Sequence, residues 1–365
     1  MLTIKPLDNS VSINDFQSYV DTVRIIPLET KEESFIINVS KLLLTSKRNY
    51  VILNSANILM FDKDGMFKFR IGKPGTGPGE YLRIVDICIS EDEEKLLVLD
   101  CYNQVLIYSL LDGHFIKNIK PKWKGKESTF DGICPSQNAG FFLFSSNPPI
   151  VDNFESDFFC VGEFDSSGNL LSESFPRKDF CFSPDRFSRS YDSSIFMRPL
   201  EGDNILYRVL GGSISSVMKI DFGELSIPCR YIFSFPGNAW LNISEYIKSP
   251  FFKLPMGFLE TNNYFYFWCG GPQGKTNEFL LNKGTYDGIS WKSSDNFPFN
   301  FIASDSTAFY AIYNNVENND SINNSEMSPL KEYIRKYYKL KNFSYESNPS
   351  IIKISFINID RKHEI

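Results

Sequence analysis

The sequence predicts an all-β fold, and three observations support that prediction. Aromatic residues make up 15% of the 365 positions, including 34 Phe and 18 Tyr, which favour half-buried strand positions. The 22 Gly and 19 Pro are spread along the chain as turn residues. Short apolar runs recur in two similar segments, and a repeat of about 40–50 residues with several strands is typical of propeller blades. Together these observations predict a six-bladed β-propeller of four-stranded antiparallel blades.

The two most similar segments predict the first two blades. In each segment an Asp-Gly pair, Asp64-Gly65 or Asp112-Gly113, supplies the positive φ angles of a tight hairpin turn. One such sheet buries little surface by itself, so the sheets are expected to stack radially and close into a ring. The expected strands are Tyr50–Asn54, Ile58–Asp62 and Phe67–Gly72 in the first segment, and Leu96–Asp100, Val105–Tyr108 and Phe115–Ile119 in the second.

Four further units follow with the same alternation of apolar runs and turns, and six units fit a chain of this length. The third has runs at Phe130–Cys134, Phe141–Phe144, Phe158–Val161 and Leu170–Phe175, and the fourth at Ser194–Met197, Asn204–Tyr207 and Val217–Phe222. The fifth has runs at Met256–Leu259, Tyr264–Trp268, Glu278–Leu281 and Gly288–Trp291, and the sixth begins with Phe299–Ile302 and Ala308–Tyr313.

Closure of the ring requires its two ends to meet. Thr22–Leu28 near the start and Ser350–Ile357 near the end both have the composition of strands. We expect them to join one blade and lock the ring. This predicts one propeller domain over residues 20–358, with an N-terminal extension over 1–19 and a C-terminal tail over 359–365.

Three stretches interrupt the repeat. Residues 176–193 are polar and aromatic, and residues 226–250 contain three prolines, so both are interpreted as long loops, the second with a short helix near Ser244–Lys248. Residues 314–327 are rich in Asn. Loops on a rigid ring commonly carry binding sites, so the aromatic and proline-rich segments are binding candidates. These segments are Pro148-Pro149, Phe180–Tyr191 and Phe233–Trp240.

One inserted helix is predicted over residues 328–340. Ser328 can act as the N-cap, and Pro329 suits the first helical position. The apolar residues that follow recur at helical spacing, so one face of the helix is expected to pack on the propeller. They are Leu330, Tyr333, Ile334 and Tyr337.

Two glycine-containing segments resemble phosphate-binding loops but are interpreted as structural. Gly72–Gly79 is followed by a strand, whereas phosphate loops place their N–H groups at a helix N-terminus. Cys269–Thr276 has cysteine where the Walker motif requires glycine, and a strand follows it as well. We expect the first to be a crossing between blades and the second a hairpin loop.

Gly72–Tyr81, followed by Val98–Asp100 and Asn103-Gln104, resembles an NHL-type repeat. The chain more closely resembles a family of bacterial six-bladed β-propeller proteins that are typically exported and often lipid-anchored. This resemblance implies the fold and export, but it transfers no catalytic residue because the family's biochemical role is largely undefined. The other segments that carry it are Ile26–Thr30, Asn204–Tyr207, Ile220–Gly223 and Asn348-Pro349.

Charge and hydropathy limit the classes of partner. The net charge of −6 and the pI of about 5.2 argue against nucleic-acid binding, which needs a basic face. No apolar run reaches the roughly 18 residues of a membrane span. The N-terminus has no leader pattern, so taken literally the protein is cytoplasmic. The resemblance implies the periplasm or the cell surface, on the assumption that an export signal before Met1 has been removed.

The residues needed for common catalytic sites are scarce. The two histidines, His114 and His363, are peripheral in sequence, which disfavours Ser-His-Asp, Cys-His and His-based zinc sites. None of the seven cysteines forms a C-x-x-C pair, and they are interpreted as buried free thiols. No cofactor is expected, although a Ca²⁺ site of carboxylate and amide oxygens stays open.

We therefore predict a non-catalytic propeller that binds a ligand or acts as a scaffold, with a glycan, a peptide or an envelope protein as its partner. The alternative is a Ca²⁺-assisted hydrolase or lyase with its site at the mouth of the central channel. Tyr81, Arg83 and Asp86 lie where an inner strand begins, and Asp131 holds the comparable place one blade later. These four residues are the expected ligand-facing positions, and no catalytic, cofactor-binding or metal-binding residue is assigned.

Overall fold

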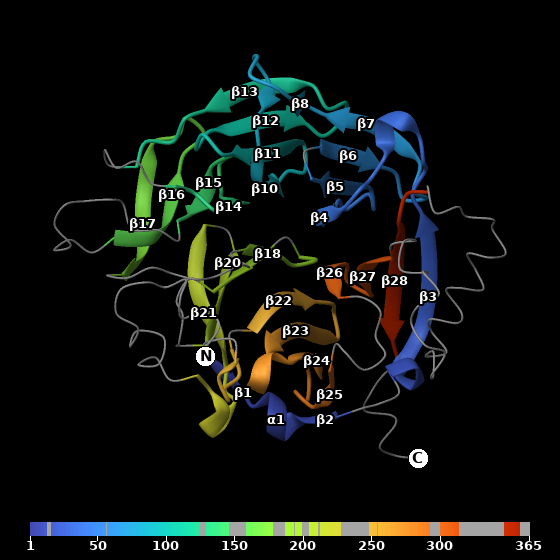
Figure 1. The fold of residues 1–365 in the computed structure, drawn as a ribbon. Coiled ribbons are helices and arrows are strands. Elements are labelled where there is room, and N and C mark those ends of the chain that lie inside the picture. The colour runs from blue at the N-terminus through green and yellow to red at the C-terminus, as the bar shows by residue number, and fades with distance from the viewer. Residues whose placement is uncertain are drawn as a thin grey trace.

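The computed structural model is a six-bladed β-propeller, as the sequence predicts, with its blades arranged around a central axis (Figure 1). We number the blades in the order of their innermost strands. The structure describes residues 1–12, 16–55, 57–123, 129–145, 158–177, 187–192, 194–198, 204–210, 212–227, 248–253, 255–292, 300–313 and 347–357. The predicted helix over 328–340 and most of the predicted helix near Ser244–Lys248 lie outside these residues, as do the segments 148–149 and 233–240.

Blades 1 to 3 are antiparallel sheets of four consecutive strands, numbered from the axis outwards. Blade 1 contains β4 (Val39–Leu44), β5 (Tyr50–Asn54), β6 (Asn57–Phe61) and β7 (Phe67–Ile71). Blade 2 contains β10 (Ile84–Ile89), β11 (Lys95–Asp100), β12 (Val105–Ser109) and β13 (Phe115–Ile119). Blade 3 contains β14 (Gly132–Pro135), β15 (Phe141–Phe144), β16 (Phe158–Phe164) and β17 (Leu170–Arg177).

Blades 4 and 5 each carry a fifth strand from the N-terminal segment. Blade 4 contains β18 (Phe187–Arg189), β19 (Ile195–Met197), β20 (Ile205–Leu210) and β21 (Ser213–Ile220), and β1 (Leu2–Ile4) pairs with β21 in parallel. Blade 5 contains β22 (Pro255–Glu260), β23 (Tyr264–Gly270), β24 (Thr276–Asn282) and β25 (Gly288–Lys292), and β2 (Ser10–Ser12) pairs with β25 in parallel. The predicted N-terminal extension therefore covers the outer edges of two blades.

Blade 6 closes the ring as predicted. Its strands are β26 (Phe301–Ser304), β27 (Phe309–Tyr313), β28 (Ser350–Phe356) and, at the outer edge, β3 (Val20–Pro27). Strand β3 comes from the start of the chain and pairs antiparallel with β28 from its end, with Ile25 opposite Ile352. A segment near the start of the chain and one near its end, β3 and β28, are thus held together by a ladder of backbone hydrogen bonds (Figure 1).

Short helical elements and one small sheet complete the described residues. The α-helix α1 spans Pro6–Asn9 between β1 and β2. The two-residue strands β8 (Lys73–Pro74) and β9 (Glu80–Tyr81) pair in parallel between blades 1 and 2. Four 3-10 turns are η1 (Phe16–Tyr19), η2 (Glu32–Ser34), η3 (Gly223–Leu225) and η4 (Pro272–Gly274).

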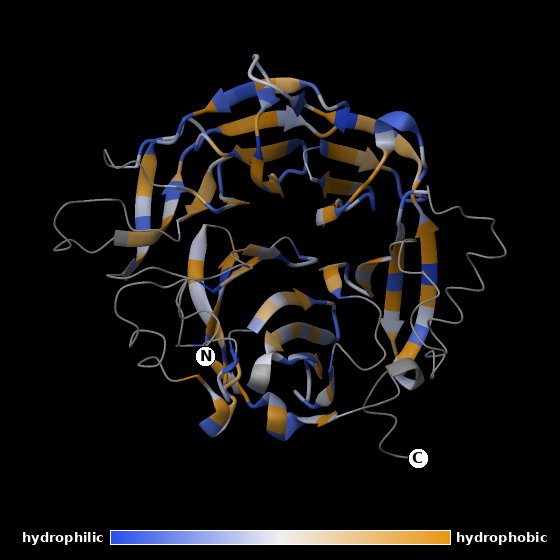
Figure 2. Cartoon of the chain, in the orientation of Figure 1, coloured by the Kyte–Doolittle hydropathy of each residue, from blue (hydrophilic) through white to orange (hydrophobic). Residues whose placement is uncertain are grey.

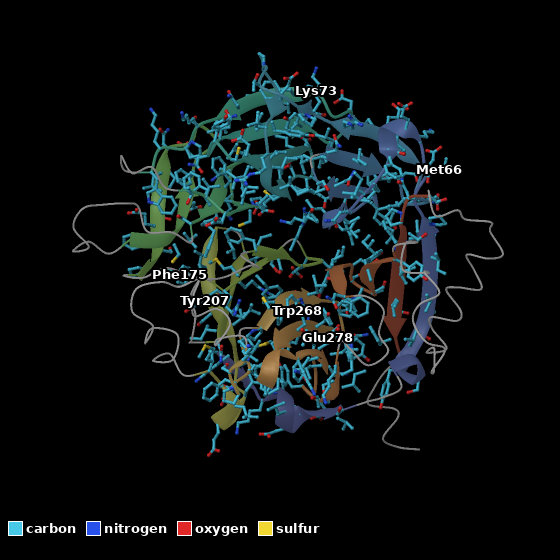
Figure 3. All side chains as sticks on the ribbon, viewed as in Figure 1. Met66, Lys73, Phe175, Tyr207, Trp268 and Glu278 are labelled. Atoms are coloured by element: carbon cyan, nitrogen blue, oxygen red, sulfur yellow. The ribbon has the colours of Figure 1, made fainter. Side chains whose placement is uncertain are left out.

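The hydrophobic core lies between neighbouring blades. The apolar residues that alternate along the strands of adjacent sheets pack together in shared clusters. Figure 2 shows the apolar segments that recur along these strands. Aromatic pairs join many of these interfaces, as for Phe175 of blade 3 and Tyr207 of blade 4, whose ring centroids lie 4.8 Å apart (Figure 3). The many aromatic residues of the sequence therefore fill the wedge-shaped spaces between neighbouring blades.

The glycine-rich segment forms the predicted crossing between blades. Gly72 has a φ of +61°, and a Cβ there would lie 2.8 Å from the Tyr81 ring and 2.9 Å from the Tyr108 ring. The bare backbone lets both tyrosines pack under the crossing, where Tyr81 donates a hydrogen bond to the Ile71 carbonyl at 3.2 Å. The segment Cys269–Thr276 forms the predicted hairpin, with η4 at its tip between β23 and β24.

Two innermost strands were missed by the sequence interpretation. Residues 176–193 were predicted as one loop, but β18 (Phe187–Arg189) lies within them and forms the axial strand of blade 4. Strand β4 (Val39–Leu44) was also not predicted. Both strands carry polar or charged residues that face the axis, and these interrupt the apolar runs by which the other strands were identified.

Candidate functional site

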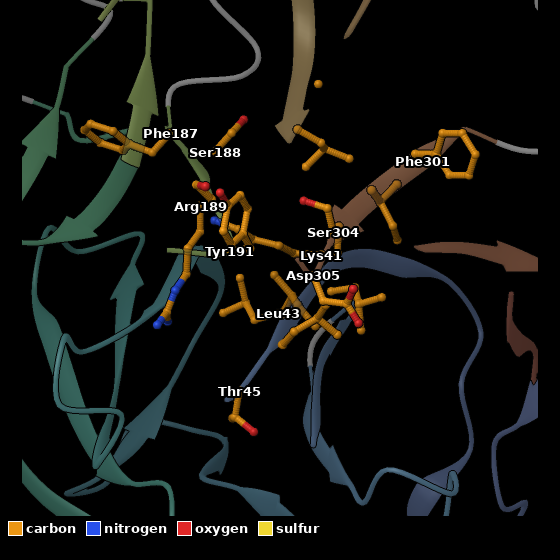
Figure 4. A pocket seen from close by; sticks show the side chains of 18 of the residues that line it. Lys41, Leu43, Thr45, Phe187, Ser188, Arg189, Tyr191, Phe301, Ser304 and Asp305 are labelled. Atoms are coloured by element: carbon orange, nitrogen blue, oxygen red, sulfur yellow. The ribbon is translucent and has the colours of Figure 1, made fainter. Parts of the chain in front are cut away.

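A cavity of about 660 Å³ runs along the axis of the propeller. Its size lies within the range of about 300–1,000 Å³ that is usual for ligand sites. Residues from the innermost strand or its start in every blade line it, so the ring as a whole forms the site. Figure 4 labels lining residues of blades 1, 4 and 6. One representative from each blade, in order, is Lys41, Asp86, Asp131, Arg189, Leu259 and Ser304.

An ion pair on the cavity wall links blades 1, 2 and 3. Lys41 Nζ of β4 lies 2.6 Å from Asp86 Oδ1 of β10, and both side chains are mostly buried. The other carboxylate oxygen of Asp86 accepts a hydrogen bond from the Ile133 N–H of β14 at 3.0 Å. Because both oxygens of Asp86 have partners in neighbouring blades, this carboxylate stabilises the packing of three blades at the cavity wall.

A second ion pair joins blades that are not neighbours. Arg189 Nη2 of blade 4 lies 2.9 Å from Glu93 Oε1, which belongs to the loop between β10 and β11 of blade 2. Glu93 Oε2 accepts hydrogen bonds at 2.7 Å from both the N–H and the hydroxyl of Ser46 in blade 1. Burial lowers the pKa of Arg189, and the charge of Glu93 opposes that shift. The guanidinium therefore stays charged, and three blades are tied together beside the cavity.

The carboxylate of Asp305 forms a third polar group where β26 ends. It accepts hydrogen bonds from Lys353 Nζ at 2.5 Å, Tyr310 Oη at 2.6 Å and the Thr307 N–H at 2.7 Å. Burial alone would raise the pKa of Asp305, but the bonds from Lys353, Tyr310 and Thr307 outweigh it and hold the pKa at about 2. Burial also raises the pKa of Tyr310, which is therefore a neutral donor to Asp305.

These contacts make the stability of the propeller depend on pH through Asp305. Its ordinary pKa of 3.8 falls to about 2 on folding. The stabilisation is complete at pH values above the pKa of Asp305 in the unfolded chain, and it is lost as the pH falls through the pKa in the folded protein. We expect Asp305→Asn to lower the free energy of unfolding at pH 7 by about 2 kcal/mol, and the deficit to shrink between about pH 4 and pH 2.

Urea denaturation at several pH values measures this difference. Asp64→Asn is the control, since Asp64 forms an ion pair with Arg24 at 3.1 Å but its side chain is 52% exposed. Exposed pairs contribute about 0–1 kcal/mol, so the control should change stability little at any pH. A deficit for Asp305→Asn that is the same at pH 7 and at low pH would contradict the linkage.

A tryptophan from the second strand of blade 5 also reaches the cavity. Trp268 of β23 lies opposite Met256, where the pairing of β22 with β23 is interrupted by a bulge. Gly257 in the bulge has a φ of +59°, and a Cβ there would lie 2.4 Å from Trp268 Nε1. The missing side chain on the axial strand thus makes room for the indole of the strand behind it. Trp268, labelled in Figure 3, lines the cavity together with Tyr191 of blade 4.

The four expected ligand-facing residues have different places. Asp86 and Asp131 both line the axial cavity. Tyr81 is only 1% exposed and packs edge-on against Tyr108 in the core between blades 1 and 2, because the glycine crossing directly above leaves room there for a large ring. Arg83 is exposed but does not line the cavity. Ligand contact by these residues remains a prediction.

Sequence reasoning did not identify Lys41, Arg189 or Trp268 as cavity residues. One signal could have pointed to Arg189: blade 4 had only three predicted strands, so a fourth was required before Ile195, and Phe187–Arg189 is that strand. The hairpin between Ser109 and Phe115 places His114 on the surface, where Nδ1 lies 2.6 Å from Asp112. Within the residues that the structure describes, no three His, Cys, Asp or Glu side chains are grouped so that they could hold a metal ion.

The cysteines in the described part of the chain are free thiols. Cys88, Cys134, Cys160 and Cys269 are buried free thiols and Cys101 is half-buried, while Cys181 and Cys229 lie outside the described part. Burial raises the pKa of Cys88, Cys134 and Cys269, so these thiols are poor nucleophiles.

No described helix has the length and apolar character needed to span a bilayer.

Comparisons with known proteins extend the description. Residues 3–355 match a family described as a domain of unknown function, DUF4934. A crystal structure of a protein proposed to be exported from Bacteroides fragilis is similar with a TM-score of 0.74 at 17% identity, covering 98% of this chain and 99% of the other. A member of the DUF4221 family from Bacteroides vulgatus is similar with a TM-score of 0.57 at 14% identity, covering 93% and 97%. No curated protein matches the sequence. At these identities the similar structures support the fold alone.

Proposed function

Because this chain belongs to the DUF4934 family, a domain of unknown function, we propose its role from its own geometry. The protein is a non-catalytic binding propeller that holds a ligand in its axial cavity. The ligand is a glycan, a peptide or a segment of a partner protein. The observation that carries the proposal is that all six blades contribute to one cavity of about 660 Å³.

The polar groups of the cavity support binding over catalysis. The carboxylates of Asp86 and Glu93 are both held by a cation and by a backbone N–H. A general acid or base must exchange protons with a substrate, and a carboxylate engaged in this way is poorly placed to do so. Neither histidine nor cysteine is among the described residues of the lining.

We propose that the protein works outside the cytoplasm. The sequence resemblance to exported, often lipid-anchored propellers supports this location, as does the similar protein from Bacteroides fragilis that is proposed to be exported. An envelope protein would then be within reach as a partner. The NHL-type character of the blades and the lipid anchor remain predictions of the sequence.

Filling the cavity tests the proposal. Ser188 lines the cavity on β18, and Ser188→Trp would occupy part of its volume. Wild type should bind members of glycan or peptide arrays, and Ser188→Trp should lower that binding by about tenfold or more. Ser167→Trp, on the exposed turn after Asp165, is the control and should bind as wild type does.

Metal analysis of the same preparation addresses the alternative reaction class. Stoichiometric Ca²⁺ that is needed for turnover of a bound glycan or peptide would contradict the non-catalytic proposal and favour the hydrolase or lyase. Binding that Ser188→Trp leaves unchanged would place the ligand elsewhere on the molecule.

A further inference from the structure

We infer that the axial cavity is built for a neutral carbohydrate. This inference rests on the proposed function and names the chemical class of its ligand. Three features of the cavity wall support it. The charged side chains are mostly engaged in ion pairs, several hydroxyl groups have no side-chain partner among the described residues, and two aromatic rings lie beside them.

The charged side chains of the wall are largely neutralised by one another. Lys41 pairs with Asp86, Arg189 with Glu93, and Asp305 with Lys353. Asp131 also has interactions of its own. A charged ligand would have to compete with these mostly buried pairs, and leaving one member unpaired is strongly unfavourable. Arg48 also lines the cavity and is exposed. Because its positive charge would attract an acidic ligand, acidic sugars are the appropriate comparison in a binding test.

Several uncharged polar groups of the wall, in contrast, are available to a ligand. Within the described part of the chain, no side-chain hydrogen bond engages the hydroxyls of Ser40, Ser188, Tyr191 and Ser306 or the indole N–H of Trp268, all of which line the cavity. Hydroxyl groups both donate and accept, so they match a ligand that carries many hydroxyls of its own. The wall thus offers neutral hydrogen-bonding groups from blades 1, 4, 5 and 6.

Two aromatic rings add apolar surface on one side of the cavity. Tyr191 follows β18 of blade 4, and Trp268 enters over Gly257 of the neighbouring blade 5. Lys283 Nζ lies 5.3 Å from the centroid of the Tyr191 ring and covers one of its faces, which leaves the other face and the hydroxyl. Figure 4 shows Ser188 and Tyr191 on one side of the pocket and Asp305 on the other.

The chemistry of a sugar ring fits this combination. A pyranose has apolar C–H faces and hydroxyl groups around its edge, while Trp and Tyr offer an apolar body with a polar tip. A few polar groups placed around aromatic surface are also the usual means of fixing a small ligand's orientation. A neutral oligosaccharide can therefore contact Tyr191 and Trp268 while bonding to the serine hydroxyls, without disturbing the ion pairs.

Titration calorimetry and tryptophan fluorescence test this inference directly. The neutral probes are cellotriose, xylotriose and mannotriose, together with a neutral glycan array, and the comparisons are trigalacturonate and a polyglutamate peptide. We expect a neutral glycan to bind and to change the fluorescence of Trp268. Trp268→Ala and Tyr191→Ala should each weaken that binding by about tenfold or more.

Two further variants separate ligand contact from structure. Gly257→Ala should displace the indole and weaken binding, because its Cβ would lie only 2.4 Å from Trp268 Nε1. Trp291→Phe is the matched control: Trp291 is 5% exposed, does not line the cavity, and should keep wild-type affinity and the fluorescence response. Circular dichroism and urea denaturation of each variant show whether the propeller is intact.

The outcomes distinguish this inference from the proposed function. Binding limited to trigalacturonate or to peptides, and sensitive to Ser188→Trp, would overturn the assignment of a neutral carbohydrate and leave a binding propeller. Neutral glycan binding that Trp268→Ala and Tyr191→Ala leave unchanged in folded protein would also overturn it. Absence of binding to both arrays would overturn the inference and the proposed function together.

Discussion

Asn348→Ala is expected to lower the free energy of unfolding by about 2–6 kcal/mol, because it breaks the hydrogen bonds that hold β28 to the segment after β3. Asn348 precedes β28 and is 2% exposed. Its Oδ1 accepts a hydrogen bond from the Ile36 N–H at 2.8 Å, and its Nδ2 donates to the carbonyls of Glu29 and Ser34, both at 2.8 Å. One side chain thus satisfies three backbone groups that follow β3.

The size of the effect comes from the groups left behind. The Ile36 N–H and the Ser34 carbonyl lose their partner, whereas the Glu29 carbonyl keeps a hydrogen bond from the Ser34 hydroxyl at 2.8 Å. Each buried donor or acceptor that loses its partner costs about 1–3 kcal/mol. Since domains are stable by only about 5–15 kcal/mol, this loss is a large fraction of the total. The loop after β3 and the start of β28 would separate more readily, and β3 is the strand that closes blade 6.

Urea denaturation followed by tryptophan fluorescence measures this change. Asn118→Ala is the control, since Asn118 lies exposed on β13 and only donates to Gln104 Oε1 at 3.3 Å. Asn348→Asp should remain strongly destabilised, because a carboxylate cannot donate to the two carbonyls. A wild-type urea midpoint for Asn348→Ala would show that the hydrogen bonds of Asn348 contribute nothing to closure.

Glu260→Ala is expected to destabilise the protein by about 3–5 kcal/mol, because it removes the acid of a buried charge cluster between blades 4 and 5. Among the described residues, Glu260 is the only acid that pairs with both Arg208 and Lys283. Glu260 ends β22 with 0% of its side chain exposed. Arg208 Nη2 and Lys283 Nζ each lie 2.8 Å from its oxygens, and the Ser190 hydroxyl donates to it as well. Without the carboxylate, two half-buried cations face each other.

A set of variants separates charge from volume at this position. Glu260→Gln keeps the shape and should still be destabilised, while adding Lys283→Met should recover part of the loss because one unpaired cation is gone. Glu94→Gln is the control: Glu94 is 74% exposed and lies 3.9 Å from Lys95, so its effect should be about 0.5 kcal/mol or less. Equal stability of Glu260→Ala and Glu94→Gln would refute the role of the cluster.

The fold could be predicted from sequence because its signals are local. Gly65 and Gly113 have φ of +84° and +77°, as their Asp-Gly turns require, and the runs beside them form hairpins of neighbouring strands. Strands that pair with their sequence neighbours need only apolar runs and turn residues to be recognised. The closing pair of β3 with β28 was predicted for a different reason, which is that a ring of blades requires its ends to meet.

The site could not be predicted in the same way. The residues missed at the axis are those whose side chains interrupt apolar runs, such as Lys41 in β4 and Arg189 in β18. A polar residue in a short strand has the same local appearance as a residue in a loop. Trp268 was missed for a different reason. A tryptophan in the apolar run of β23 is expected in the core, and only the bulge at Gly257 brings it to the cavity.

The sequence by itself determined the repeated blades, their approximate strand bounds and the closure of the ring, because hydrophobic patterning and turn chemistry act between residues close along the chain. Tertiary structure alone decided which polar groups meet at the axis. Glu93 contacts Arg189 and Ser46, and Lys41 contacts Asp86, although each contact joins different blades. Such pairs depend on the angle and radius at which blades pack, and no local pattern encodes those quantities.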